Sequence, residues 1–101
     1  MTKNVTNDVG KQRYELAVAD DVAIAAYEER GDTVVFTHTV VPPALEGHGV
    51  GSRLIQGALD DVRRNGGHVI AECSFVAAYL ERHPDQQDLM RLAGRIYQRR
   101  K

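Results

Sequence analysis

The sequence predicts a single α+β domain, a mixed and mostly antiparallel sheet flanked by helices. Three observations predict it: short apolar segments with strand character, a change to helical periodicity after a glycine-rich turn, and a length of 101 residues, which suits one domain. Hydrophobic residues make up 43% of the chain and charged residues 27%, as in an ordinary globular protein. We expect one domain over residues 11–101, preceded by a flexible leader over residues 1–10.

The first half of the chain predicts three antiparallel strands. Arg13–Val18 alternates apolar and polar side chains, Val22–Tyr27 follows an acidic turn, and Thr33–Val41 is dense in β-branched residues. The last of these is the strongest strand. Pro42-Pro43 ends it, because proline has no N–H to donate to a strand ladder.

The second half predicts a helix, a strand and two more helices. From Val50 the apolar residues recur at helical spacing until Asn65-Gly66-Gly67, where glycine supplies the positive φ of a C-cap. The later elements are expected at His68–Cys73 (strand), Phe75–Arg82 (helix) and Gln86–Arg99 (helix). The predicted order is therefore β-β-β-α-β-α-α, with parallel strands on either side of the first helix.

Composition and charge exclude several classes of function. The formal net charge of −1 gives no electrostatic reason to expect nucleic acid or a membrane as a partner. Cys73 is the only cysteine, which suits a reducing compartment, and no apolar run approaches the ~20 residues of a membrane span. No histidine pair has metal-ligand spacing, so we predict no metal. We expect a cytoplasmic monomer or weak dimer.

The glycine-rich turn is the strongest candidate site. Gly47, Gly49 and Gly51 stand between the longest strand and the first helix, where unpaired N–H groups attract phosphate. Ser52 and Arg53 could add a hydroxyl and a cation. A P-loop would need Gly-Lys-Ser/Thr, and a dinucleotide fingerprint would need glycine in place of Ser52. A turn that uses glycine only for its geometry remains an open alternative.

The turn resembles the signature Gln/Arg-x-x-Gly-x-Gly/Ala of the GCN5-related N-acetyltransferase superfamily. Glu46, Gly49 and Gly51 occupy its positions, and Glu46 departs from the usual Gln or Arg. A closer likeness is to the minimal YjdJ-type or NATD1-like subgroup, whose members share two motifs. In this chain they read His38-Thr39-Val40-Val41-Pro42-Pro43-Ala44-Leu45-Glu46-Gly47-His48-Gly49-Val50-Gly51 and Cys73-Ser74-Phe75-Val76-Ala77-Ala78-Tyr79, followed by His83-Pro84.

The resemblance implies a fold, a cofactor and a reaction. The sheet should splay after the long strand, and acetyl-coenzyme A should bind there as co-substrate for transfer of acetyl to an amine, either a protein lysine, an N-terminus or a small molecule. The pantetheine arm would lie along Thr39, Val40 and Val41. The remaining cofactor contacts are expected from Glu46, Gly47, His48, Gly49, Val50, Gly51, Ser52 and Phe75.

Three side chains are candidates for the chemistry. His38 could act as a general base, Cys73 as a nucleophile, and Tyr79 as the acid that protonates the departing thiolate. Each also has a structural interpretation: a packed strand histidine, a small buried hydrophobe and a core aromatic. Two alternatives to an enzyme remain open, a coenzyme-A-binding module without turnover and an interaction domain whose glycines are only structural.

Overall fold

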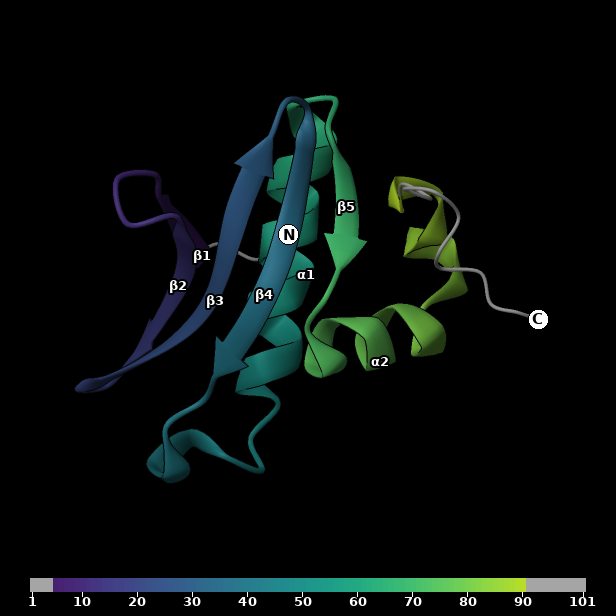
Figure 1. Ribbon diagram of the computed structural model, residues 1–101. Helices are drawn as coiled ribbons and strands as arrows, with labels where there is room; N and C mark the ends of the chain where they lie inside the picture. Colours follow the sequence, from purple (N-terminus) through teal and green to yellow (C-terminus); the bar gives the residue numbers. More distant parts are fainter. Residues whose placement is uncertain (1–4, 91–101) are drawn as a thin grey trace.

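The computed structural model describes residues 5–90, which form one five-stranded sheet with two α-helices and two 3-10 helices (Figure 1). The strands are β1 (Val5–Asp8), β2 (Arg13–Val18), β3 (Asp21–Arg30), β4 (Thr33–Val40) and β5 (His68–Ala71). The helices are η1 (Pro43–Leu45), α1 (Val50–Arg64), α2 (Ser74–Arg82) and η2 (Pro84–Leu89). The strands follow one another across the sheet in sequence order, and only β4 and β5 are parallel. The predicted α+β class is confirmed, as is the parallel pair around α1.

The expected leader is wrong for residues 5–8, which form the edge strand β1. This strand pairs with β2 from Val5↔Leu16 to Asp8↔Arg13. It also lies against the middle of α1, because Gly57 has no side chain. A Cβ at Gly57 would lie 2.5 Å from Val5 Cγ2. The glycine in the middle of α1 therefore lets β1 pack closely against the helix. The polar sequence of this strand does not by itself predict a strand.

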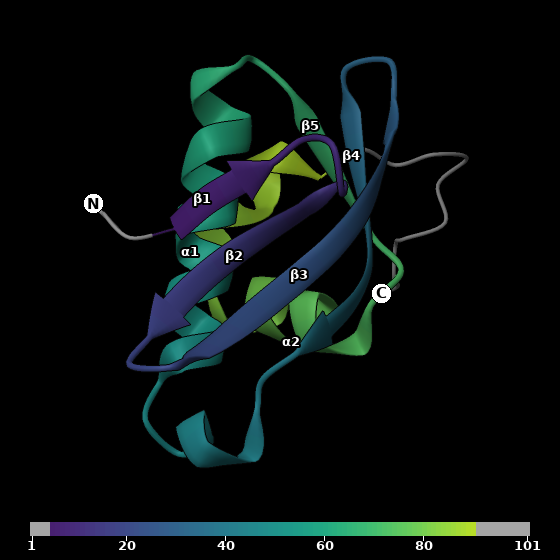
Figure 2. The same ribbon diagram turned by 90° about the vertical axis from the view of Figure 1, so that its left-hand side faces the viewer.

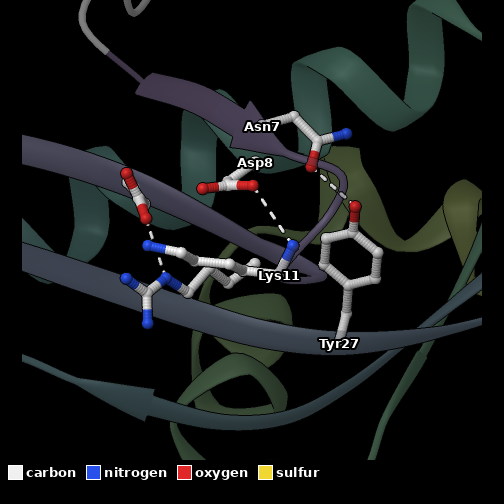
Figure 3. Close-up of polar contacts among 6 residues, drawn as sticks. Asn7, Asp8, Lys11 and Tyr27 are labelled. Carbon is white, nitrogen blue, oxygen red and sulfur yellow. Dashed lines mark hydrogen bonds and ion pairs between the residues drawn. The ribbon is translucent and has the colours of Figure 1, made fainter.

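Two side-chain hydrogen bonds hold β1 and the turn after it (Figure 3). The Tyr27 hydroxyl donates to Asn7 Oδ1 over 2.6 Å, and the Lys11 N–H donates to Asp8 Oδ1 over 3.1 Å. The first bond ties β1 to β3 across the intervening strand, so β1 is fixed by the sheet, by α1 and by a long-range polar contact.

The expected helix over Gln86–Arg99 is also corrected at its start. Residues Pro84–Leu89 form a 3-10 helix, and Met90 makes an isolated parallel bridge with Val69 of β5. Pro84 opens this segment, and the side chains of Gln86 and Asp88 both bind Arg63 of α1. The rest of the expected helix, residues 91–99, lies outside the described residues. Within residues 5–90, no helix combines the length and the apolar character needed to cross a membrane.

Both α-helices contribute to one core on the same side of the sheet. Figure 2 shows β1, β2 and β3 in front with α1 and α2 behind them. Fully buried side chains from the sheet and from both helices meet there, among them Leu16, Phe36, Leu54, Ile55, Val76 and Tyr79. On the other face of the sheet Val22 and Val40 stay 42% and 47% exposed. The two α-helices thus pack on one face, while the other face carries these exposed valines and also Val35, which is fully buried opposite Glu28.

A β-bulge in β4 decides which way the end of this strand faces. Ala26 of β3 pairs with His38, but the next residue, Tyr27, pairs with Phe36, so Thr37 is unopposed. The Thr37 hydroxyl donates to the Ala26 carbonyl at 3.3 Å and holds the bulge. Residues directly opposite each other share a face of the sheet, and an inserted residue reverses the alternation. The residues of β4 after Thr37 therefore point to the opposite faces from those that they would have in a regular strand.

The hydrogen bond between buried Tyr14 and half-buried Asp61 makes the free energy of unfolding depend on alkaline pH. The Tyr14 hydroxyl donates to Asp61 Oδ2 at 2.8 Å, and burial, followed by this hydrogen bond, raises the pKa of Tyr14 far above its usual value. In the unfolded chain this phenol ionises near pH ~10. A group whose pKa is raised by folding stabilises the protein fully below its unfolded pKa and loses that contribution as the pH rises above it.

We therefore expect a free energy of unfolding that falls above pH ~10. Tyr14→Phe should lower it by about 1–2 kcal/mol at neutral pH, because a hydrogen bond to a partly exposed carboxylate is lost. The variant should also lose less stability above pH ~10 than the parent protein, because the Tyr14 phenol is gone. Some loss should remain, because burial still raises the pKa of Tyr27. Urea unfolding at a series of pH values measures both effects. Identical alkaline profiles would contradict this account.

Candidate functional site

A cavity of about 530 Å³ lies where the end of β4 meets the starts of α1 and α2. In Figure 1 these three segments gather at the bottom of the molecule, with η1 and its loop below them. The cavity is lined by Thr39, Val40, Val41, Leu45, Glu46, Gly47, Gly49, Val50, Gly51, Ser52 and Phe75. Its lining thus combines main chain of a strand end with main chain of a helix start.

The start of α1 presents main-chain N–H groups to this cavity. Gly49 is the N-cap and adopts φ 73°, and Gly47 before it adopts φ 84°, both in the left-handed region that favours glycine. Neither a side-chain cap nor an acidic residue accompanies the first turn. The free N–H groups and the partial positive charge of the helix terminus therefore face the cavity, where they would attract an anion.

The end of β4 contributes an unpaired strand edge. β5 runs beside β4 only from Thr33↔His68 to Phe36↔Ala71, and the N–H of Glu72 then donates to the Phe36 carbonyl at 3.0 Å. Beyond that point, within residues 5–90, no strand borders this edge of Thr37–Val40. Unpaired N–H and C=O groups on such an edge can bind an extended chain with amide groups of its own.

Phe75 and Gly51 close the cavity by direct packing. A Cβ at Gly51 would lie 2.5 Å from the tip of the Phe75 ring, so the ring lies directly on the helix backbone. This contact joins the first turns of α1 and α2 and places the half-buried ring in the cavity lining. Gly51 is therefore required for a close approach rather than for backbone freedom, which distinguishes it from Gly47 and Gly49.

The predicted cofactor residues are brought together with one exception. All of them except His48 line the cavity. His48 is exposed between Gly47 and Gly49 and lies outside the lining. Leu45 was missed: it is only 6% exposed and lines the cavity from η1. The available signal was a single large aliphatic residue in a loop of proline, alanine, glycine and polar residues, which indicates a side chain that is buried.

Of the predicted catalytic residues, Cys73 makes a hydrogen-bonding contact with a residue of the cavity lining. It is 7% exposed and is the N-cap of α2, and its sulfur lies 3.3 Å from the hydroxyl of Thr39. Thr39 lines the cavity, so a single hydrogen-bonding contact connects the thiol to the cavity wall. The β4 bulge makes this contact possible, because it turns Thr39 toward the helix side of the sheet.

Tyr79 and His38 are placed elsewhere. The Tyr79 hydroxyl is buried and donates to Gln56 Oε1 at 2.6 Å, and the ring stacks on His83 with centroids 3.9 Å apart. Burial, followed by the charge of Asp85, raises the pKa of this phenol. His38 is exposed on the sheet face opposite Thr39. No hydrogen bond between described residues joins His38, Cys73 and Tyr79, so the structure does not form a catalytic triad from them.

Glu46 is the one charged residue among those that line the cavity, and its side chain is exposed. Cationic attraction from lining side chains is therefore missing, and the positive potential comes from the helix start. In the described part of the chain, no three His, Cys, Asp or Glu side chains converge as metal ligands would.

A mixed sheet that opens beside a helix N-terminus, with one cavity joining both, suits an extended ligand with a phosphate at one end. The chain belongs to the GCN5-related N-acetyltransferase family, because the model of the family described as "GCN5-related N-acetyl-transferase" matches residues 13–89. Membership of this family supports acetyl transfer as the general activity of the protein.

A solved structure agrees with this assignment. The chain is similar to a GCN5-like putative N-acetyltransferase from Staphylococcus aureus, known from an NMR solution structure, with 25% sequence identity and a TM-score of 0.68. The likeness covers 96% of this chain and 99% of the other. None of the curated proteins compared with the chain is a significant match.

Proposed function

We propose that the protein is an acetyl-coenzyme-A-dependent N-acetyltransferase that binds its co-substrate in the cavity between β4 and α1. The observation that carries this proposal is the cavity itself, which joins an unpaired strand edge to an uncapped helix start. We further propose that the chain belongs to the minimal YjdJ-type or NATD1-like subgroup, on the two motifs from His38 to Gly51 and from Cys73 to Tyr79.

The two parts of the cavity suit the two parts of coenzyme A. The pantetheine arm contains two amides, which can pair with the N–H and C=O groups of Thr39–Val41 as an added strand would. The pyrophosphate would bind the N–H groups of Gly47–Ser52 at the start of α1. This orientation brings the thioester toward Thr39 and Cys73, which are already in contact.

In the reaction, the nitrogen lone pair of a neutral amine attacks the thioester carbonyl carbon. The C–S bond breaks, an amide forms, and the departing thiolate takes up the proton that the amine loses. His38, exposed on the open face of the sheet, is proposed as the base that removes this proton from an acceptor arriving from that side. Tyr79 is given no catalytic role, because its hydroxyl is buried and already donates to Gln56.

Cys73 is proposed as a nucleophile. Its thiolate would attack the acetyl-coenzyme A thioester and expel the coenzyme A thiolate, which takes up the proton that Cys73 has lost. The thioester that the amine attacks is then acetyl-Cys73, and the thiol of Cys73 is restored when the amide forms. We expect Cys73→Ser and Cys73→Ala to lower the rate by about 100-fold or more while acetyl-coenzyme A still binds. Tyr79→Phe is the matched control: it should cost about 0.5–1.5 kcal/mol of stability and keep the rate. An unchanged rate of acetyl transfer in both Cys73 variants would contradict the covalent step.

Thiol release measures the activity directly. The protein is incubated with acetyl-coenzyme A and a panel of acceptors, namely lysine peptides, free peptide N-termini and small amines, and free thiol is followed over time. Release that depends on one acceptor class supports the enzyme and identifies the amine. Binding of acetyl-coenzyme A without release for any of them would favour a coenzyme-binding module. The three predicted catalytic residues lie outside the cavity lining, which is the observation that keeps this second function in view.

A further inference from the structure

We propose that Glu46 opposes the binding of phosphate in the cavity, and so makes the site more tolerant of thioester donors that carry less negative charge. The inference rests on the proposed function. Glu46 is the only charged residue among those that line the cavity, and it directly precedes the Gly47–Ser52 segment that faces the expected pyrophosphate.

Nothing near Glu46 neutralises its carboxylate in the described part of the chain. The ion pairs of residues 5–90 involve Glu15, Glu28, Asp61, Asp88 and Asp32, and none involves Glu46. Its own N–H is bonded to the Pro43 carbonyl over 3.2 Å, which fixes the backbone that bears the charge at the end of η1. Within the described residues the carboxylate is therefore unpaired, next to the segment where the phosphate is expected.

The expected size of the effect follows from Coulomb's law. Two unit charges about 6 Å apart in water repel by an amount equal to a factor of ~3 in affinity, and a pyrophosphate carries two charges. Because the side chain is exposed, added salt weakens the repulsion: the Debye length is about 10 Å at 0.1 M and shortens as the salt concentration rises. Removing the charge should therefore strengthen coenzyme A binding by about threefold to tenfold at low salt.

A different role for Glu46 predicts the opposite sign. If the carboxylate accepted a hydrogen bond from a hydroxyl or amide of the ligand, its removal would weaken binding of coenzyme A and of pantetheine alike. Pantetheine, which carries no phosphate, therefore separates repulsion of phosphate from a direct contact.

The test is calorimetric titration of coenzyme A, with NMR titration of pantetheine, into the parent protein, Glu46→Gln, Glu46→Ala and the control Glu29→Gln. Glu29 is a second exposed glutamate without an ion pair in the described residues, at the far end of the β3–β4 ladder, opposite Val34. We expect both Glu46 variants to bind coenzyme A about threefold to tenfold more tightly in 20 mM salt, and by less in 0.5 M salt. Pantetheine affinity should stay unchanged, and so should the control.

Equal or weaker coenzyme A binding in both Glu46 variants would overturn the inference, as would a gain that persists for pantetheine. Absence of coenzyme A binding in every protein would instead contradict the proposed function, so the two failures are distinguishable.

Discussion

Gly51→Ala is expected to weaken acetyl-coenzyme A binding about tenfold while the fold is retained. The new Cβ would lie 2.5 Å from the Phe75 ring, so the ring must shift from its place in the cavity lining. To bind the coenzyme, the variant must bring the ring back to its parent position against the new Cβ, and such overpacking costs about 1–3 kcal/mol. Each loss of about 1.4 kcal/mol lowers the affinity tenfold. Calorimetric titration measures the loss, and circular dichroism checks the fold.

The matched control is the double variant Gly51→Ala/Phe75→Leu. Leucine is shorter than the phenylalanine ring, so the contact is relieved and affinity should return toward that of Phe75→Leu alone. If the loss of affinity in the double variant equals the sum of the losses in the two single variants, the residues act independently. That result would contradict the proposed contact.

Gly57→Ala is expected to destabilise the protein by about 1–3 kcal/mol, although helix propensity alone predicts a gain of about 1 kcal/mol from replacing glycine by alanine. The added Cβ would lie 2.5 Å from Val5 Cγ2 and 2.6 Å from Val5 Cβ, so β1 as a whole must move. The bond from Tyr27 to Asn7 should then be lost. The opposite signs of the two effects make the measurement decisive.

Thermal unfolding and amide hydrogen exchange measure this prediction together. For a domain of this size, 1 kcal/mol corresponds to about 4–8 °C in Tm. Protection should fall first in Val5–Asp8 and persist in α1. A higher Tm with unchanged protection in β1 would mean that the strand does not depend on close approach to the helix.

The central part of the fold could be predicted from sequence because its patterns are local. Arg13–Val18 is a strand with those bounds, and α1 ends at Arg64 with Asn65 as its C-cap, before the two glycines, as expected. Strand alternation and helical periodicity are each visible within one element, so no knowledge of distant contacts was needed. The cavity lining was predictable for the same reason: most of it comes from one continuous segment, Thr39–Ser52.

The parts that failed depend on contacts between distant residues. Residues 5–8 become a strand because Gly57, far along the chain, leaves room for Val5. Regular alternation would have placed His38 on the same side as Phe36, but the Thr37 bulge turns His38 outward and Thr39 inward. The predicted helix over Gln86–Arg99 begins instead as a 3-10 helix, with Gln86 and Asp88 bonded to Arg63.

The predictions for the candidate catalytic residues differ in the same way, between local patterns and contacts of distant residues. Cys73 and Thr39 belong to separate motifs, and the sequence placed both near the expected cleft, where the structure brings them within 3.3 Å. Tyr79 lies on a helix face that packs against Gln56 of α1, and that pairing could not be seen in either helix alone.

The most direct test of the central claim is an NMR titration of the isotopically labelled protein with acetyl-coenzyme A. Binding in the cavity predicts saturable chemical-shift changes in the amides of Thr39–Val41 and Gly47–Ser52, with β1 and the β3–β4 turn unaffected. Saturable changes centred on another part of the molecule, or no changes at millimolar coenzyme, would contradict the assignment of this cavity as the coenzyme site.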